Sequence, residues 1–287
     1  MPGGRAPRRS SRGGGRMTDR PVIAGVDGSD DALKAVRWAT SEAARRHARL
    51  TLLLVNDDPA RAEYAQQAVQ KAARACTAQE PGIEVVSEVA EGHPVEELLR
   101  RSEHAQMLVL GARGHGGFTD ALLGGVSTAV ATHAACPVVV VRRSIPTSVG
   151  PVVVGVDGSA SSTRALEFAF ESAARTSAEL VVLQAWHEEG LLTELIPAPD
   201  PEQVQREVER SVTEQTAQLR EQHPQVRTRE VVLHEHPVAA LTNAARDARL
   251  LVVGHRGRGG FETLFLGSVA SGVLHHAPCP VAVVRMP

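Results

Sequence analysis

Two glycine-rich stretches are the residues of this chain best suited to bind a ligand. GARGHGGFTDALLGGVST at 111–128 holds six glycines in eighteen positions, and GHRGRGGFETLFLGSVAS at 254–271 nearly repeats it. Glycine lets the backbone approach a ligand closely and adopt positive φ. A helix that starts after such a loop offers unpaired N–H groups and a partial positive charge. One such loop alone is equally typical of a flexible surface segment, but two at matching places predict phosphate binding.

The glycine loops differ from the two best-known phosphate-binding motifs. Neither contains the Gly-Lys pair of a Walker A loop, and the only lysines of the chain are Lys34 and Lys71. The glycines follow the fourth expected strand of each unit, whereas the dinucleotide fingerprint follows the first. The pairs His234 and His236, and His275 and His276, have no closed ligand set around them, so we predict no metal site.

The sequence contains an internal repeat of one long unit. VIAGVDGS at 22–29 returns as VVVGVDGS at 152–159, an offset of 130, whereas the glycine loops are offset by 143. The second unit therefore has about 13 extra residues, which we place near 191–201. We expect one domain at 20–143, a linker at 144–150 and a second domain at 151–287. Residues 1–19 are rich in Gly, Pro and Arg and are expected to be a disordered extension. Either this extension is an arm that binds nucleic acid or a partner, or, as we favour, residues 1–16 are upstream sequence or a dispensable tail before a start at Met17.

Strand-like and helix-like segments alternate within each unit. In the first we expect strands at 21–27, 50–56, 83–90, 107–111 and 137–141, and helices at 31–48, 61–76, 94–105 and 126–135. Ser29 or Asp30 can cap the first helix, and Pro94 suits the first turn of the third. Continuous apolar strands between helices predict an α/β fold, a doubly wound parallel sheet covered on both faces. Such folds bind ligands at the carboxyl ends of the strands.

Composition excludes several classes of protein. With a net charge of −2 and 3% aromatic residues, the chain has neither the basic surface nor the stacking residues of a nucleic-acid binder. No apolar run is long enough to span a membrane, and no apolar segment follows the N-terminal arginines as in a secretory signal. Cys76, Cys136 and Cys279 form no CxxC pair and are expected to be buried thiols.

The linked motifs resemble those of the universal stress protein family. The spacing G-x2-G-x9-G occurs at Gly111, Gly114 and Gly124 and again later in the chain, with GVDGS at the first strand and CPV before the last. The resemblance covers residues 20–286 in two copies. It implies two tandem flavodoxin-like, Rossmann-like domains, each with a five-stranded parallel sheet of order 3-2-1-4-5. It also implies ATP binding, with or without Mg²⁺.

The resemblance assigns a nucleotide site to each domain. Asp27 and Asp157 match the acidic residue that contacts the nucleoside, although a turn or cap role is the alternative. Val55 and Ala185 match the residue whose backbone meets adenine, and Ser268 matches a hydroxyl donor to phosphate. The expected residues are Gly25, Val26, Asp27, Val55, Gly111, Gly114, Gly124, Gly125, Val126 and Ser127 in the first domain. In the second they are Gly155, Val156, Asp157, Ala185, Gly254, Gly257, Arg258, Gly267, Ser268 and Val269.

Each copy departs from the family pattern at one position. Gly125 stands where the family prefers Ser or Thr, and Glu235 replaces the glycine found at Gly92. A lost hydrogen bond to phosphate costs roughly 1.5–3 kcal/mol, whereas Glu235 repels phosphate only if it faces the crevice. We therefore expect both sites to bind, the second more tightly. Arg113, Arg256 and Arg258 are either phosphate ligands or solvated loop charges.

The expected function is that of an ATP-binding regulatory protein of the stress response, not an enzyme, because no catalytic base stands beside the loops. A nucleotide-independent interaction scaffold and a slow ATPase are the alternatives. The apolar fifth strand of each copy lies at a sheet edge, where bare strands pair. We expect the two domains to pair there, with a further homodimer, and the resemblance implies a cytoplasmic protein.

Overall fold

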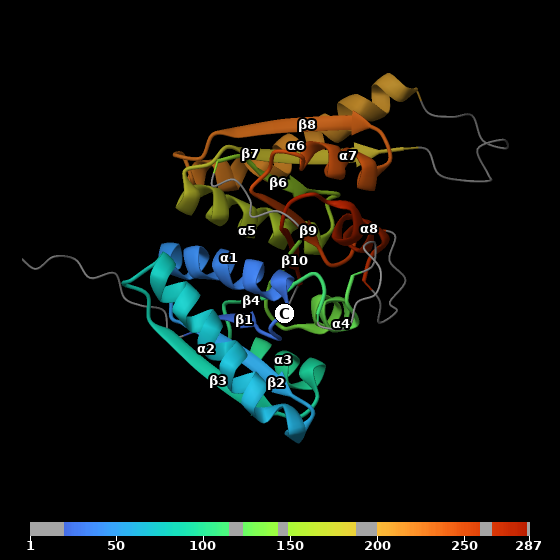
Figure 1. Cartoon of the computed structure of the whole chain (residues 1–287). Coiled ribbons are helices and arrows are strands. Elements are labelled where there is room, and N and C mark those ends of the chain that lie inside the picture. The colour runs from blue at the N-terminus through green and yellow to red at the C-terminus, as the bar shows by residue number, and fades with distance from the viewer. Residues whose placement is uncertain (1–19, 115–122, 143–148, 188–199, 259–265, 286–287) are drawn as a thin grey trace, which may run out of the picture.

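The computed structural model describes residues 20–114, 123–142, 149–187, 200–258 and 266–285. Ten strands form one sheet of order β3-β2-β1-β4-β5-β10-β9-β6-β7-β8 (Figure 1). Each half is parallel and has the predicted order 3-2-1-4-5, so the expected fold class is confirmed. The expected N-terminal extension at 1–19, and most of the linker and of the 191–201 insertion, lie outside the described residues.

The α-helices and strands of the two halves correspond one to one, and the first half has in addition a short 3-10 turn. The first half contains β1 (Val22–Gly25), α1 (Asp30–Arg46), β2 (Leu50–Asn56), a 3-10 turn at Pro59–Arg61, α2 (Ala62–Gln79), β3 (Val85–Glu91), α3 (Pro94–Ser102), β4 (Met107–Gly111), α4 (Gly125–His133) and β5 (Val138–Val141). The second contains β6 (Val152–Gly155), α5 (Ala160–Thr176), β7 (Leu180–Trp186), α6 (Pro201–Gln222), β8 (Thr228–His234), α7 (Pro237–Ala244), β9 (Leu250–Gly254), α8 (Ser268–His276) and β10 (Val281–Val284).

Local sequence signals explain where α1 begins and ends. Of the two expected caps it is Ser29 whose side chain accepts a hydrogen bond, from the N–H of Ala32 at 3.1 Å. The prediction of helix through residue 48 is wrong at the end, because His47 adopts the left-handed conformation with φ 50° and closes the helix. Its N–H donates to the carbonyls of Ala43 and Ala44.

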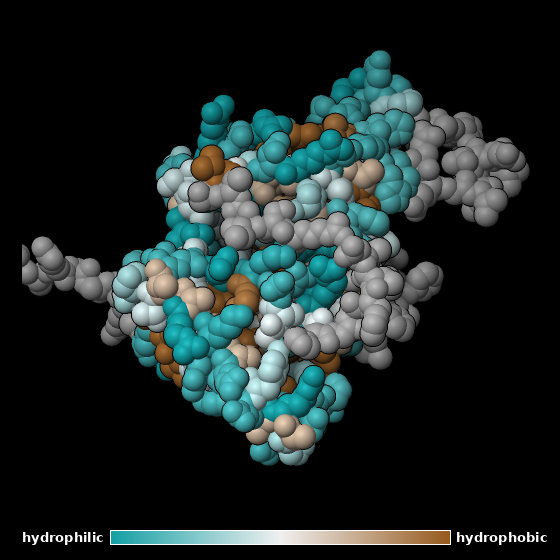
Figure 2. Space-filling model, in the orientation of Figure 1, coloured by the Kyte–Doolittle hydropathy of each residue, from teal (hydrophilic) through white to brown (hydrophobic). Residues whose placement is uncertain are grey.

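Helices cover both faces of the sheet, and each face has its own core. One buried cluster joins the sheet to α1, α2, α5 and α6, and the other joins it to α3, α4, α7 and α8. The central strands are buried on both faces, which explains their continuous apolar sequences. In the view of Figure 2 the described surface is mainly hydrophilic. No described helix is long and apolar enough to cross a membrane.

The two domains meet through their fifth strands, as predicted. β5 and β10 pair antiparallel, with Val139 opposite Ala282, and this pairing joins two parallel halves into one mixed sheet. Side chains cross the seam as well. Arg142 donates to the carbonyls of Leu274 and His275, and Arg285 donates to the carbonyl of Thr132 at 3.2 Å.

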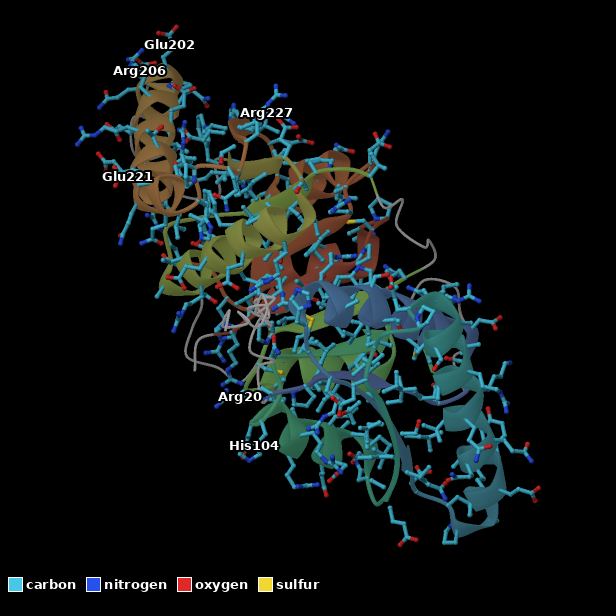
Figure 3. The ribbon with its side chains drawn as sticks, turned by 90° about the vertical axis from the view of Figure 1, so that its left-hand side faces the viewer. Arg20, His104, Glu202, Arg206, Glu221 and Arg227 are labelled. Atoms are coloured by element: carbon cyan, nitrogen blue, oxygen red, sulfur yellow. The ribbon has the colours of Figure 1, made fainter. Side chains whose placement is uncertain are left out.

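The longest described helix lies in the second domain. α6 has 22 residues, whereas its counterpart α2 has 18. Figure 3 shows Glu202, Arg206 and Glu221 on α6 pointing away from the body of the protein. Glu202 and Arg206 form an exposed ion pair of 3.4 Å, which is typical of a solvated helix face.

Candidate functional site

Two cavities lie at equivalent places, where the carboxyl ends of β1 and β4, and of β6 and β9, leave the sheet. Their volumes are about 620 and 520 Å³, which suits a small-molecule ligand. The first is lined by Gly25, Val26, Asp27, Val55, Gly111, Gly114, Gly124, Gly125, Val126 and Ser127 among others. The second is lined by Gly155, Val156, Asp157, Ala185, Gly254, Gly257, Arg258, Gly267, Ser268 and Val269 among others. The structure thus brings all the predicted site residues of each domain to one cavity.

The glycines at the strand ends permit close packing. A Cβ on Gly111 would lie 2.7 Å from the carbonyl carbon of Asp31, and one on Gly254 would lie 2.8 Å from that of Ser161. A Cβ on Gly114 would lie 2.7 Å from Oδ2 of Asp27. Glycine at these positions therefore lets the loop pack on the start of α1 or α5 and leaves room for the aspartate.

A helix begins at each glycine loop without a side-chain cap. α4 starts after Gly124 and α8 after Gly267, and neither residue has a side chain that can accept from the first turn. The first N–H groups of a helix have no acceptor within the helix. Val126 and Val269 of these first turns line the cavities. The helix starts therefore present backbone donors and a partial positive charge at the ligand cavity.

The two aspartates anchor the turns that follow β1 and β6. Asp27 Oδ1 accepts from the N–H of Ser29 at 2.9 Å, and Asp157 Oδ1 accepts from that of Ser159 at 2.9 Å. Asp157 Oδ2 also accepts from the N–H of Arg258 at 3.0 Å. Burial raises the pKa of Asp157, but the hydrogen bonds from Ser159 and Arg258 outweigh it, and the net pKa lies below its ordinary value. Both carboxylates thus hold their turns, and the carboxylate of Asp157 stays charged at the cavity wall.

The charges around the cavities differ. Arg113 in the first pairs with Asp31 at 3.0 Å. At the position of Asp31 the second domain has the uncharged Ser161, whose hydroxyl lies 2.7 Å from Nδ1 of His255. The first cavity is lined by two arginines and two aspartates, Asp27 and Asp57, and the second by two arginines and one aspartate. The second cavity therefore has the more positive lining of the two.

The hydroxyl groups at the starts of α4 and α8 also differ between the two cavities. In the first domain, Ser127 donates to the carbonyl of Gly111 at 2.7 Å, and Thr128 to that of Gly124 at 3.0 Å. Gly125 itself has open space around it, since a Cβ there would meet no atom within 4 Å. At the equivalent place the second domain has Ser268, which lines the cavity.

Glu235, the residue that departs from the pattern in the second domain, is not among the residues that line the cavity. Its backbone N–H donates to the carbonyl of Trp186 at 3.1 Å, and its Oε1 lies 3.5 Å from Nδ2 of Asn243. The carboxylate is therefore held on the outer side of the loop, and the repulsion considered for it is not expected.

Sequence reasoning missed the apolar walls and some charged groups of both cavities. Pro94 and Leu98 of α3 line the first, and Pro237 and Leu241 of α7 line the second. It also missed Asp57 and Arg61 in the first cavity and His187 in the second. The prolines and leucines recur at the offset of 143, so a full alignment of the two copies carries the signal for them.

The structure also places the candidate histidines and the cysteine thiols. His234 stacks on Trp186 with ring centroids 4.1 Å apart. Within the described residues, no group of three or more His, Cys, Asp or Glu side chains is placed to hold a metal ion. The thiols are free and buried, and burial raises the pKa of Cys136 and of Cys279 to about 12.

These features define a class of protein: a tandem α/β protein with one small-molecule cavity at the switch point of each doubly wound half. The model of the universal stress protein family matches residues 19–142 and 149–285. The chain belongs to the universal stress protein family.

Similar proteins share its full tandem architecture. It is 35% identical to a universal stress protein of Mycobacterium tuberculosis over 286 residues, 92% of this chain and 96% of the relative. It is 34% identical to one of Mycolicibacterium smegmatis over 93% of this chain and 98% of the relative. The crystal structure of a universal stress protein from Archaeoglobus fulgidus has a TM-score of 0.71 at 22% identity, with coverage of 94% and 99%. That likeness supports the fold.

Proposed function

We propose that each domain binds one adenine nucleotide, ATP first of all, and that the protein is a nucleotide-binding regulator of the stress response. The observation that carries the proposal is the convergence of one carboxylate, one glycine loop and one uncapped helix start on each cavity. Donors at a helix start suit phosphate, and a carboxylate suits ribose hydroxyls. A bound Mg²⁺ would bridge phosphate oxygens and needs no closed set of protein ligands.

The apolar walls fit the proposed orientation of the ligand. Pro94 and Leu98 line the first cavity together with Val26 and Leu53, and Pro237 and Leu241 line the second together with Val156 and Leu183. A planar adenine packs well between apolar side chains. The base then lies toward α3 or α7, and the phosphates lie toward the start of α4 or α8.

Storage or sensing of nucleotide fits these groups better than catalysis. Hydrolysis requires a positioned water, a base and charge stabilisation at the γ-phosphate. Asp27 and Asp157 are tied to the turns after β1 and β6, which places them at the ribose end in the proposed orientation. We therefore propose that ATP is held and is hydrolysed slowly or not at all, in a cytoplasmic protein.

Matched aspartate variants test the proposal. We expect ATP to bind at two sites in isothermal titration calorimetry, and Asp157→Ala to weaken the tighter one by about tenfold or more, because a charged hydrogen bond is lost. Asp27→Ala is expected to weaken only the looser site. Thermal unfolding of both variants controls for loss of the turns. A larger loss of affinity in Asp27→Ala would contradict the predicted order of the sites.

Two further measurements separate the alternatives. Chromatography of the small molecules released from denatured protein distinguishes a nucleotide binder from a nucleotide-independent scaffold, which would release none and show no heat of binding. Steady-state phosphate release distinguishes a slow ATPase, and abolition of that release by Asp157→Ala would tie it to the second cavity. Sedimentation at several concentrations tests the proposed homodimer of the tandem chain.

A further inference from the structure

A third cavity, of about 480 Å³, lies between the two domains and away from both proposed nucleotide sites. Its walls are one side of α1, the end of α5 and the starts of β6 and β9, including Val152 and Leu250. Figure 1 shows α1 and α5 side by side on one face of the sheet, and the two helices are in contact. The cavity therefore exists only because the two domains are paired.

The lining of this interdomain cavity is strongly basic. It includes five basic side chains and one acidic one: Lys34, Arg37, Arg45, Arg175, Arg249 and Glu42. The single carboxylate is shared, because Glu42 lies 2.6 Å from Nε of Arg46 and 3.6 Å from Nε of Arg45. Lys34 and Arg175 pair with Asp31 and Glu171, which are not among the lining residues. A cavity with this balance of charge attracts an anion.

Buried polar groups at the cavity are left without partners. Nε of Arg249 and Oγ of Ser172 are buried and have no hydrogen-bond partner among the residues that the structure describes. Burial lowers the pKa of Arg249, and the neighbouring charge of Arg45 lowers it further. Arg249 is half-buried, and its Nη1 donates to the carbonyl of Thr176 at 3.3 Å. An anion in the cavity would supply the acceptor that its buried Nε lacks.

The cavity lies where the two domains differ at two aligned positions of α1 and α5. α1 and α5 align at the offset of 130, so Arg46 corresponds to Thr176 and Phe168 to Trp38. The Arg46 guanidinium lies 5.5 Å from the centroid of the Phe168 ring and covers it. At the related place in the cavity, the short Thr176 stands opposite Trp38, and both line the cavity. Phe168 is thus covered by Arg46, whereas Trp38, which is half-buried against the core, keeps part of its surface in the cavity.

We propose that this interdomain cavity binds a small anion with two or more negative charges, held by its basic side chains beside Trp38. Phosphates and carboxylates share the required chemistry, since both accept bidentate hydrogen bonds from arginine. Ligand bound there contacts both domains, so it stabilises the paired arrangement. The proposal does not depend on nucleotide binding at the other two cavities.

Trp38 provides a direct probe. The chain has two tryptophans, so Trp186→Phe leaves the Trp38 indole as the only reporter. We would titrate this full-length variant with inorganic pyrophosphate and, in a second arm, with citrate, using sodium chloride of equal ionic strength as control. Arg249→Gln and Arg37→Gln are the test substitutions in the same background. Arg210→Gln, at an exposed residue of α6 paired with Glu214, is the matched control.

We expect a saturable change of Trp38 fluorescence with at least one polyanion, and about tenfold weaker binding in each test variant. The control variant is expected to bind as the parent does. Thermal unfolding of each variant without ligand controls for loss of structure, including loss of the hydrogen bond from Arg249 to the carbonyl of Thr176. Whichever of the two anions binds with the higher affinity identifies phosphate or carboxylate as the preferred group. The proposal would be overturned if sodium chloride of equal ionic strength changed the fluorescence as much as the polyanions do. It would also be overturned if the test and control variants bound with equal affinity.

Discussion

The swap of Gly125 and Ser268 between the two sites is the most informative perturbation of the proposed phosphate cradle. Gly125 is the first residue of α4 and Ser268 the first of α8. A Cβ on Gly125 meets no atom within 4 Å, so Gly125→Ser adds a hydroxyl without displacing a neighbour. Ser127 and Thr128 already donate to backbone carbonyls, so the new hydroxyl is the one directed to ligand.

The size of the effect follows from one hydrogen bond. A hydrogen bond to a charged group contributes about 1.5–3 kcal/mol, and each 1.4 kcal/mol corresponds to about tenfold in affinity. We therefore expect Gly125→Ser to tighten ATP binding at the first site by about 10- to 100-fold. Ser268→Gly is expected to weaken the second site by a similar factor.

Calorimetric titration with ATP measures each site in turn. Gly125→Ser is made in the Asp157→Ala background, and Ser268→Gly in the Asp27→Ala background, so that one site dominates each titration. Gly125→Ala is the matched control, because it adds the same Cβ without the hydroxyl. If Gly125→Ser binds ATP no more tightly than Gly125→Ala, the hydroxyl does not reach phosphate and the reasoning is refuted.

Three other predictions concern single groups. Burial raises the pKa of Cys136 and Cys279 to about 12, so Ellman's reagent is expected to label neither before unfolding; rapid labelling of native protein would contradict this. Burial and nearby arginines lower the pKa of His255 from 6.5 to about 4, so the unfolded chain binds this proton more readily and stability falls from pH 6.5 toward pH 4. His255→Ala is expected to flatten that slope in urea unfolding, and an unchanged slope would count against it. Gly257→Ala places a Cβ 2.5 Å from Oδ2 of Asp157, so calorimetry is expected to show weaker ATP binding; parental affinity would argue against that steric effect.

The duplicated motifs made most of the fold predictable. Continuous apolar strands and the offsets of 130 and 143 define two doubly wound units, and the bare fifth strands predict the pairing of β5 with β10. The end of α1 was not predictable in the same way, because left-handed φ at a non-glycine residue such as His47 depends on the local chain path. Helical periodicity alone extends the helix past that point.

The candidate sites were predictable where the chemistry lies within a motif. Asp27 and the glycines are local in sequence, whereas Leu98 reaches the cavity only through the packing of α3 on the sheet. The pairing of Arg113 with Asp31 also joins residues far apart in the chain. The interdomain cavity could not be predicted from the motifs, because the pairing of the domains creates it from residues of α1, α5, β6 and β9.

The two halves belong to one chain and share one sheet, so they escape a constraint that symmetry imposes on homodimers. In a homodimer every residue occurs on both sides of the two-fold axis, so any change in one groove is copied into its mate. A tethered pair also stays associated at any dilution, because the tether sets a high effective concentration. Each half of this chain is therefore free to specialise. Arg46 can cover the Phe168 ring, while the shorter Thr176 at the aligned position lines the interdomain cavity. Likewise, Gly125 and Ser268 can give the two related ligand cavities different affinities.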